Sequence, residues 1–80
     1  MSSRFEFKIG EIALIRENSY LCQGRIMNDA TLMTYVSEAQ NCVILEQDRR
    51  LTSIVQYYVF LQQDQIQGWV YYYDLEKLDG

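Results

Sequence analysis

The sequence contains no proline and no histidine, and it has only four glycines and two cysteines. Without histidine it lacks the commonest general base at neutral pH, so a Ser-His-Asp triad and a Cys-His pair are excluded. Cys22 and Cys42 are too few for a disulfide framework and too far apart in sequence for a zinc or redox pair. The scattered glycines form no phosphate-binding loop. We therefore expect no enzyme, no cofactor and no metal site.

The length and composition indicate one small globular domain. The chain has 80 residues, of which 49% are hydrophobic and 22% charged, and these ordinary values exclude intrinsic disorder. We expect a single domain over residues 1–80. The longest apolar run, residues 57–61, is far shorter than the ~20 residues of a membrane span, and the amino terminus lacks the apolar segment of a signal peptide. These features predict a cytoplasmic protein with both cysteines as buried free thiols.

The charge is acidic and unevenly distributed. Seven Lys and Arg against eleven Asp and Glu give a net charge of −4, which disfavours direct nucleic-acid binding. Near the carboxy terminus we expect an acidic rim made of Asp64, Asp74, Glu76 and Asp79. An acidic edge of this kind most often keeps a protein soluble, and less often docks a partner.

Short β-type runs separated by polar residues dominate the chain. Strands are expected over residues 9–15, 20–27, 42–47, 54–61 and 68–73. Residues 32–36 fit either a helix or a strand, and their β-branched and aromatic residues favour a strand. Residues 48–50 are expected to form a charged turn. Residues 74–78 are expected to form one helical or 3₁₀ turn capped by Asp74.

The number of strands predicts how the sheet is shaped. Five or six mostly antiparallel strands in so small a domain would expose long edges if the sheet were flat. Curling into a small barrel, with bends near Gly10, Gly24 and Gly68, removes most of that exposure. The expected fold is therefore an all-β small barrel.

Aromatic residues make up 14% of the sequence and gather on the last two expected strands. Alternation along residues 54–61 gives an inward face of Val55, Tyr57, Val59 and Leu61, and an outward face of Gln56, Tyr58 and Phe60. On the last strand, the outward face holds either Trp69, Tyr71 and Tyr73 or Val70 and Tyr72. In either phase several rings reach the surface.

Exposed tyrosine and tryptophan rings often supply the hot spots of protein interfaces, because they bury a large area at little cost in rotamer freedom. The same rings could instead form cross-strand pairs that only stabilise the sheet. We expect a partner-binding surface made of Tyr20, Tyr58, Phe60, Trp69, Tyr71 and Tyr72.

Other chemistry-bearing residues favour structural roles. A cysteine nucleophile would need a cation beside it, and Arg25 lies three residues after Cys22, on the opposite face of a strand. Glu46 and Asp48 share a strand face and could hold a hard cation, but no further oxygen ligand lies near them in sequence.

Two segments resemble a known family. Residues 7–15 (FKIGEIALI) have the glycine-centred opening common in SH3-like small barrels, including bacterial SH3-type domains. Gly68, Trp69 and Val70, followed by Leu75, resemble the closing strand and short 3₁₀ turn of SH3 domains. The resemblance implies a small barrel of five to six strands with a short carboxy-terminal 3₁₀ turn.

The sequence departs from the peptide-binding members of that family. Those members carry an Ala-Leu-Tyr-Asp-Tyr-like segment, whereas here Ala13 and Leu14 run into Ile15, Arg16 and Glu17. The chain also lacks proline and has only one tryptophan. These departures argue against binding of proline-rich peptides.

We therefore expect a non-catalytic protein-binding module, or a small subunit or regulator of a larger complex. The alternative is a phage-type acidic inhibitor (anti-CRISPR-like) that blocks a nucleic-acid site on an effector protein. An oligonucleotide-binding barrel is a third class, which the thin positive charge disfavours. An exposed edge strand would also allow two copies to form a homodimer.

Overall fold

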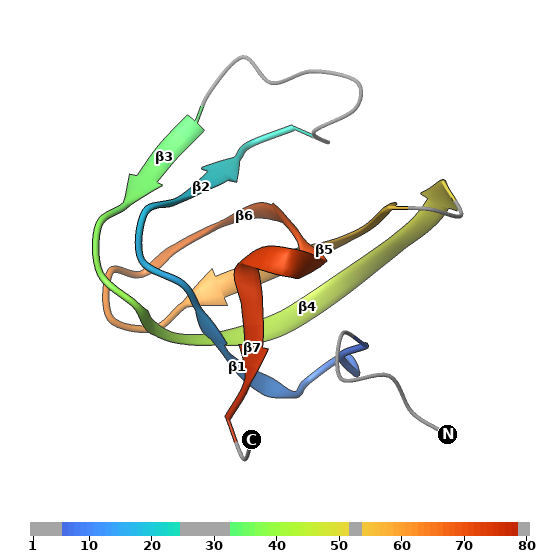
Figure 1. Cartoon of the computed structure of the whole chain (residues 1–80), viewed down its shortest axis with the longest axis horizontal. Helices are drawn as coiled ribbons and strands as arrows, with labels where there is room; N and C mark the ends of the chain where they lie inside the picture. Colours follow the sequence, from blue (N-terminus) through green and yellow to red (C-terminus); the bar gives the residue numbers. More distant parts are fainter. Residues whose placement is uncertain (1–5, 25–32, 52–53, 79–80) are drawn as a thin grey trace.

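Seven strands and one 3₁₀ turn form the computed structural model, which describes residues 6–24, 33–51 and 54–78 (Figure 1). The elements are β1 (Ile12–Ile15), β2 (Ser19–Cys22), β3 (Met33–Val36), β4 (Gln40–Leu51), β5 (Ile54–Leu61), β6 (Ile66–Tyr71), η1 (Tyr72–Asp74) and β7 (Leu75–Lys77). The expected all-β class is confirmed. The described residues form seven strands, whereas five to six were expected.

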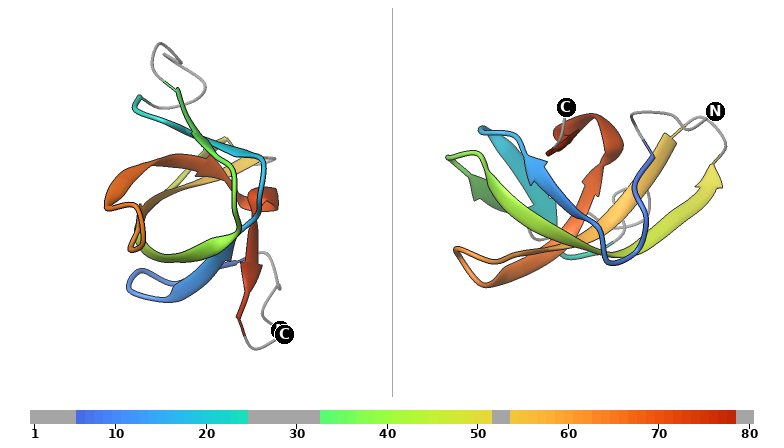
Figure 2. Two further views of the ribbon diagram at one scale, coloured as in Figure 1. Left: turned by 90° about the vertical axis from the view of Figure 1, so that its left-hand side faces the viewer. Right: turned by 90° about the horizontal axis from the view of Figure 1, so that it is seen from below.

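All seven strands belong to one antiparallel sheet in the order β3-β2-β6-β5-β4-β1-β7. The sheet curls into a half-barrel, as the two views in Figure 2 show. Strands far apart in sequence therefore meet, since β1 pairs with both β4 and β7. The short β3 and β7 are the two edges of the sheet.

The inner face of the curled sheet holds the core. Its residues are Phe7, Ala13, Ile15, Leu21, Val36, Cys42, Ile44, Tyr57, Val59, Leu61, Val70 and Leu75. The inward face expected for β5 is confirmed, because Tyr57, Val59 and Leu61 are fully buried and Val55 packs against the core. Gln56 is an exception to the expected outward face, since only 4% of it is exposed.

The charged turn expected over residues 48–50 is wrong. These residues continue β4, because the ladder with β5 extends past them to the pair Leu51↔Ile54, with a register shift after Asp48. Pairing with a neighbouring strand overrides the turn preference of this charged triplet.

The expected carboxy-terminal 3₁₀ turn is present, but it spans Tyr72–Asp74 and not residues 74–78. Leu75 begins β7, which pairs with β1.

Gly10 and Gly68, two of the glycines at which bends were expected, occupy positions that favour glycine. Gly10 lies in a turn with φ +90°, a conformation that favours glycine. Gly68 lies within β6, where a Cβ would be 2.9 Å from the Leu21 Cβ and 3.0 Å from the Cys22 carbonyl oxygen. The absence of a side chain at Gly68 therefore lets β2 cross β6 closely.

Both cysteines are free and buried, as expected. Burial raises the pKa of the Cys42 thiol to about 12, and a hydrogen bond with the Ala13 backbone offsets a smaller part of this rise. Burial also raises the pKa of Cys22. Within the described ranges, no helix is long and apolar enough to cross a membrane. The part of the expected second strand that includes Arg25 lies outside the described residues.

Candidate functional site

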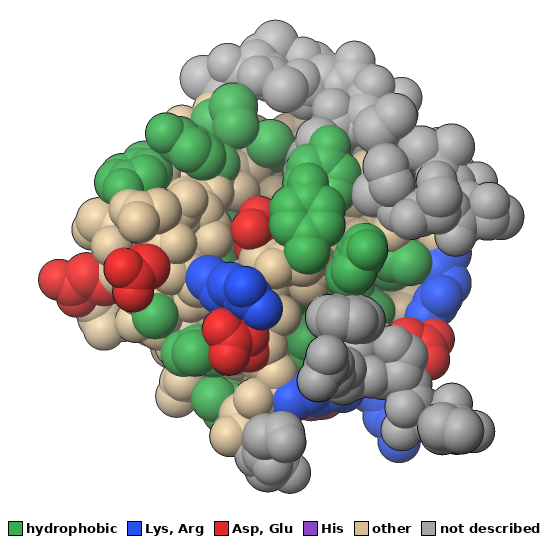
Figure 3. All heavy atoms as spheres, in the orientation of Figure 1, with side chains coloured by type: hydrophobic (Ala, Val, Ile, Leu, Met, Phe, Trp, Pro, Cys, Tyr) green, Lys and Arg blue, Asp and Glu red, His purple; other side chains and the backbone are tan. Residues whose placement is uncertain are grey.

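A groove lies between the β2–β3 hairpin and the end of β6 with η1. We call it the aromatic groove; it encloses about 290 Å³, and its lining residues are Asn18, Ser19, Tyr20, Cys22, Met33, Tyr71 and Asp74. Hydrophobic side chains gather over β2–β3 and beside η1 in Figure 3, with an acidic side chain between the two groups. The groove therefore combines aromatic walls with one carboxylate.

The first wall comes from the β2–β3 hairpin. Tyr20 and Tyr35 are directly opposite each other in the ladder, and their ring centroids are 5.2 Å apart. The Tyr35 hydroxyl donates a hydrogen bond to the Asn18 side-chain oxygen, which ties this wall to the turn before β2. Tyr20, Met33 and Tyr35 are each about half exposed (49%, 52% and 50%). This wall thus presents apolar area that the fold does not cover.

The second wall comes from the end of β6 and from η1. The rings of Tyr71 and Tyr73 stack with centroids 5.1 Å apart and an interplanar angle of 13°. Tyr72 meets Tyr73 edge-on but packs against the core. The backbone N–H of Arg16 donates a 2.9 Å hydrogen bond to the Asp74 carbonyl, which fixes η1 to the end of β1.

Asp74 gives the groove its charge. Burial raises the pKa of its carboxyl above the ordinary value, while the positive charge of Arg16 lowers it in part. The Arg16 guanidinium itself binds Glu76, with 3.1 Å between Nε and Oε2. Burial also raises the pKa of Tyr73, and the nearby Asp74 carboxylate adds to the rise.

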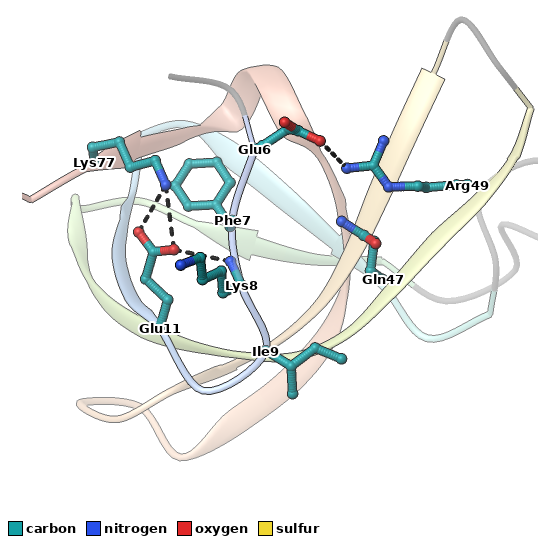
Figure 4. Close-up of a pocket in the computed structure, with 8 residues that line it drawn as sticks. All are labelled: Glu6, Phe7, Lys8, Ile9, Glu11, Gln47, Arg49 and Lys77. Carbon is teal, nitrogen blue, oxygen red and sulfur yellow. Dashed lines mark hydrogen bonds and ion pairs between the residues drawn. The ribbon is translucent and has the colours of Figure 1, made fainter. Parts of the chain in front are cut away.

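A second, larger pocket lies on the amino-terminal side of the sheet (Figure 4). It encloses about 800 Å³, and its lining residues are Glu6, Phe7, Lys8, Ile9, Glu11, Gln47, Arg49 and Lys77. Two ion pairs line it: Lys77 binds Glu11 with Nζ–Oε2 2.9 Å, and Arg49 binds Glu6. We name it the mixed-charge pocket.

Phe7 and Glu11 make the contacts that hold the mixed-charge pocket together. The Lys77 ammonium lies 4.5 Å from the centroid of the Phe7 ring. The Lys8 backbone N–H donates to Glu11 Oε1 at 2.9 Å. Burial alone would raise the pKa of Glu11, but the hydrogen bonds from Lys8 and Lys77 and their charges lower it below 4.5. These contacts tie the amino-terminal segment to β7.

The structure divides the expected binding surface into separate parts. Tyr20 and Tyr71 line the aromatic groove. Tyr58 and Trp69 are opposite each other on β5 and β6, with ring centroids 5.2 Å apart. Trp69 is only 8% exposed, so the expectation that its ring is at the surface is wrong. Tyr58 carries its hydroxyl at the surface, where Gln67 Nε2 donates to it at 2.7 Å.

The remaining two expected residues also differ from the prediction. Phe60 is half-buried on β5, opposite Gln67 and away from the aromatic groove. Tyr72, the first residue of η1, is partly buried and packs against the core. The fold therefore covers part of this ring.

The expected acidic rim is not continuous. Asp64 lies in the turn between β5 and β6, where it accepts a hydrogen bond from Gln40 Nε2 at 3.1 Å. That turn and η1 lie on different sides of the curled sheet in Figures 1 and 2. Glu76 lies on β7 and binds Arg16, and Asp79 lies outside the described residues. Of the expected rim, Asp74 alone lines the aromatic groove.

Sequence reasoning missed Met33, which lines the groove, and also Tyr35 and Tyr73, whose rings contact the lining residues Tyr20 and Tyr71. Tyr20 and Tyr35 face each other only if residues 32–36 form a strand that returns along β2, and this segment was ambiguous. Among the described residues, no group of three or more His, Cys, Asp or Glu side chains could hold a metal ion. Glu46 and Asp48 lie on either side of Gln47 on β4, as expected.

Comparison with known proteins gives no relative. No family model matches the sequence, and neither the curated proteins nor the solved structures contain a significant match. The function therefore has to be inferred from the surface of the fold.

Proposed function

We propose that this chain is a non-catalytic module that binds another protein, either alone or as a small subunit or regulator of a larger complex. The observation that carries the proposal is the aromatic groove. Its two walls expose tyrosine rings from separate parts of the chain, with Tyr20, Tyr35 and Tyr73 each about half exposed. Rings in such positions bury large areas on binding at little entropic cost.

We also propose that the barrel is SH3-like. Five strands follow one another in the order β7-β1-β4-β5-β6, and η1 directly precedes the last strand of the chain. This arrangement supports the resemblance of residues 7–15 and of Gly68, Trp69 and Leu75 to that family. Because the motif of its peptide-binding members is absent, the proposed partner is not a proline-rich peptide.

The test is capture of the partner by groove variants. The immobilised chain is compared with a Tyr20→Ala, Tyr73→Ala double variant, and the captured proteins are measured by quantitative mass spectrometry. We expect a specific partner to lose about tenfold or more in recovery, because hot-spot rings each contribute roughly 1–2 kcal/mol or more. Circular dichroism checks that the variant folds.

A matched variant on the outer face, Tyr58→Ala with Phe60→Ala, separates the two candidate surfaces. Partner recovery should persist in this variant. Loss of the partner here, with recovery retained in the groove variant, would place the docking surface on the outer face of β5 and would contradict the role of the groove.

Salt dependence separates the proposal from the acidic-inhibitor alternative. Docking through rings should change little between about 0.1 M and about 0.5 M salt, because screening acts mainly on exposed charges. Steep loss of the partner over that range would instead favour an inhibitor that binds through its carboxylates.

A further inference from the structure

The aromatic groove is too small for a whole small-molecule ligand but suits one long side chain. Its volume of about 290 Å³ lies at the lower limit of the roughly 300–1,000 Å³ typical of sites that enclose such ligands. The groove is also open toward solvent along the exposed side chains of Tyr20 and Met33. An extended partner could therefore insert one side chain while its backbone stays outside.

The charge of the groove selects the kind of side chain. The Asp74 carboxylate lines it together with Tyr20 and Tyr71. Arg16, whose positive charge acts on Asp74, also binds Glu76, with 3.1 Å between Nε and Oε2. A partly buried carboxylate gains most from a cation that replaces its lost hydration. The faces of tyrosine rings attract cations as well.

We propose that the aromatic groove receives one cationic side chain of the partner, a lysine ammonium or an arginine guanidinium, with its charge beside Asp74 and its stem against Tyr20 and Tyr71. This inference rests on the proposed function, because it describes how the partner is recognised. It adds a requirement that ring docking alone does not impose: the inserted group must be positively charged.

The test uses two small probes that differ in charge but little in shape: N-acetyl-arginine methylamide and N-acetyl-citrulline methylamide. Each is titrated into the chain while the ring signals of Tyr20 and Tyr71 are followed by NMR. We expect saturable shifts with the arginine probe and binding about fivefold weaker or more with the citrulline probe, as a partly exposed ion pair and cation–π contact together would give. Equal binding of the two probes, or no saturable shift with arginine, overturns the inference.

An Asp74→Asn variant tests whether the Asp74 carboxylate is the group that binds the cationic probe. We expect it to bind the arginine probe about fivefold more weakly, while the matched charge change Glu38→Gln, at an exposed position between β3 and β4, leaves binding unchanged. Equal losses in the two variants would indicate net charge alone and would contradict the inference. The comparison of the two probes on the unaltered chain needs no variant, so it decides the question even where a variant folds poorly.

The outcome is separable from that of the proposed function. Partner capture that depends on Tyr20 and Tyr73, combined with equal affinity for the two probes, would keep the docking function and overturn the cationic ligand. Probe binding without any effect of the ring variants on capture would keep the cation site and contradict the docking function.

Discussion

The Tyr57 hydroxyl accepts a hydrogen bond from the backbone N–H of Phe7 at 3.1 Å, fifty residues away in sequence. The two rings also meet edge to face with centroids 5.4 Å apart. Gln47 Nε2 donates to the same hydroxyl at 3.3 Å. One buried side chain thus ties the amino-terminal segment to β4 and β5.

Replacing Tyr57 by Phe should destabilise the fold by about 1–2 kcal/mol, because the buried Phe7 N–H loses its acceptor. Urea unfolding followed by circular dichroism measures the change. The control is Tyr58→Phe, which removes a hydroxyl bonded to Gln67 at the surface and should cost less than about 0.5 kcal/mol. Equal losses in the two variants would contradict the role given to Tyr57.

Replacing Gly68 by Ala should cost about 1–3 kcal/mol, because its Cβ would press on Leu21 and the Cys22 carbonyl. Chemical shifts of Leu21 and Cys22 should move with it. Gly10→Ala is the comparison: a Cβ there meets nothing within 4 Å, and the expected loss of about 1 kcal/mol comes from φ alone. Unchanged shifts of β2 in Gly68→Ala would rule out the close crossing.

Glu11 should make stability depend on pH at the acidic end. Its folded pKa lies below the ordinary 4.5, so its contribution is complete above that pH and is lost as the pH falls through the folded pKa. Glu11→Gln should therefore cost about 1 kcal/mol at pH 7 and progressively less at more acidic pH. For Glu76→Gln, whose pair with Arg16 is about half exposed (51% and 48% for Arg16 and Glu76), we expect a loss below about 0.5 kcal/mol.

Asp74 should change the pH dependence of stability in the opposite direction from Glu11. Its folded pKa is raised above 3.8, so the fold is most stable where the group is protonated and loses that stability as the pH rises through the folded pKa. Asp74→Asn should therefore raise stability at pH 7 by about 0.5 kcal/mol while weakening the cation site. Lower stability at pH 7, measured by urea unfolding, would show that the carboxylate supports the fold instead.

Cys42 should be inert in the folded protein. With its pKa raised from 9.0 to about 12, the thiolate fraction at pH 8 falls about a thousandfold. A Cys22→Ser variant isolates this thiol for titration with a disulfide reagent at pH 8. The thiol should react only after unfolding in guanidinium. Rapid reaction of the native variant would contradict its burial.

The alternation of residues along the strands predicted which side chains face the core, but it did not predict how most of the surface residues are grouped. Tyr57, Val59 and Leu61 alternate with residues of the other face, so the inward side of β5 could be predicted from the sequence. Cys42 could be assigned to the interior because a small apolar thiol among apolar neighbours is usually buried.

The aromatic groove could not be predicted in the same way. It forms where β2 crosses β6, and that crossing depends on the close approach of Leu21 to Gly68, which has no side chain. The burial of Trp69 depends likewise on long-range packing and not on alternation. Tyr71 and Tyr73 belong to one wall because β6 ends at Tyr71 and η1 begins at Tyr72. The sequence pattern instead predicted that the strand continues to residue 73.

Among the described residues, one pair, Cys22↔Trp69, joins β2 to β6 in the backbone ladder. One side-chain hydrogen bond, from Gln23 Nε2 to the Gln67 carbonyl at 3.1 Å, adds to it. The wall that carries Tyr20 is thus attached to the rest of the sheet at a narrow junction, while the wall that carries Tyr71 continues a six-residue strand. Adjusting the distance between the walls to fit ligands of different thickness would disturb few backbone hydrogen bonds.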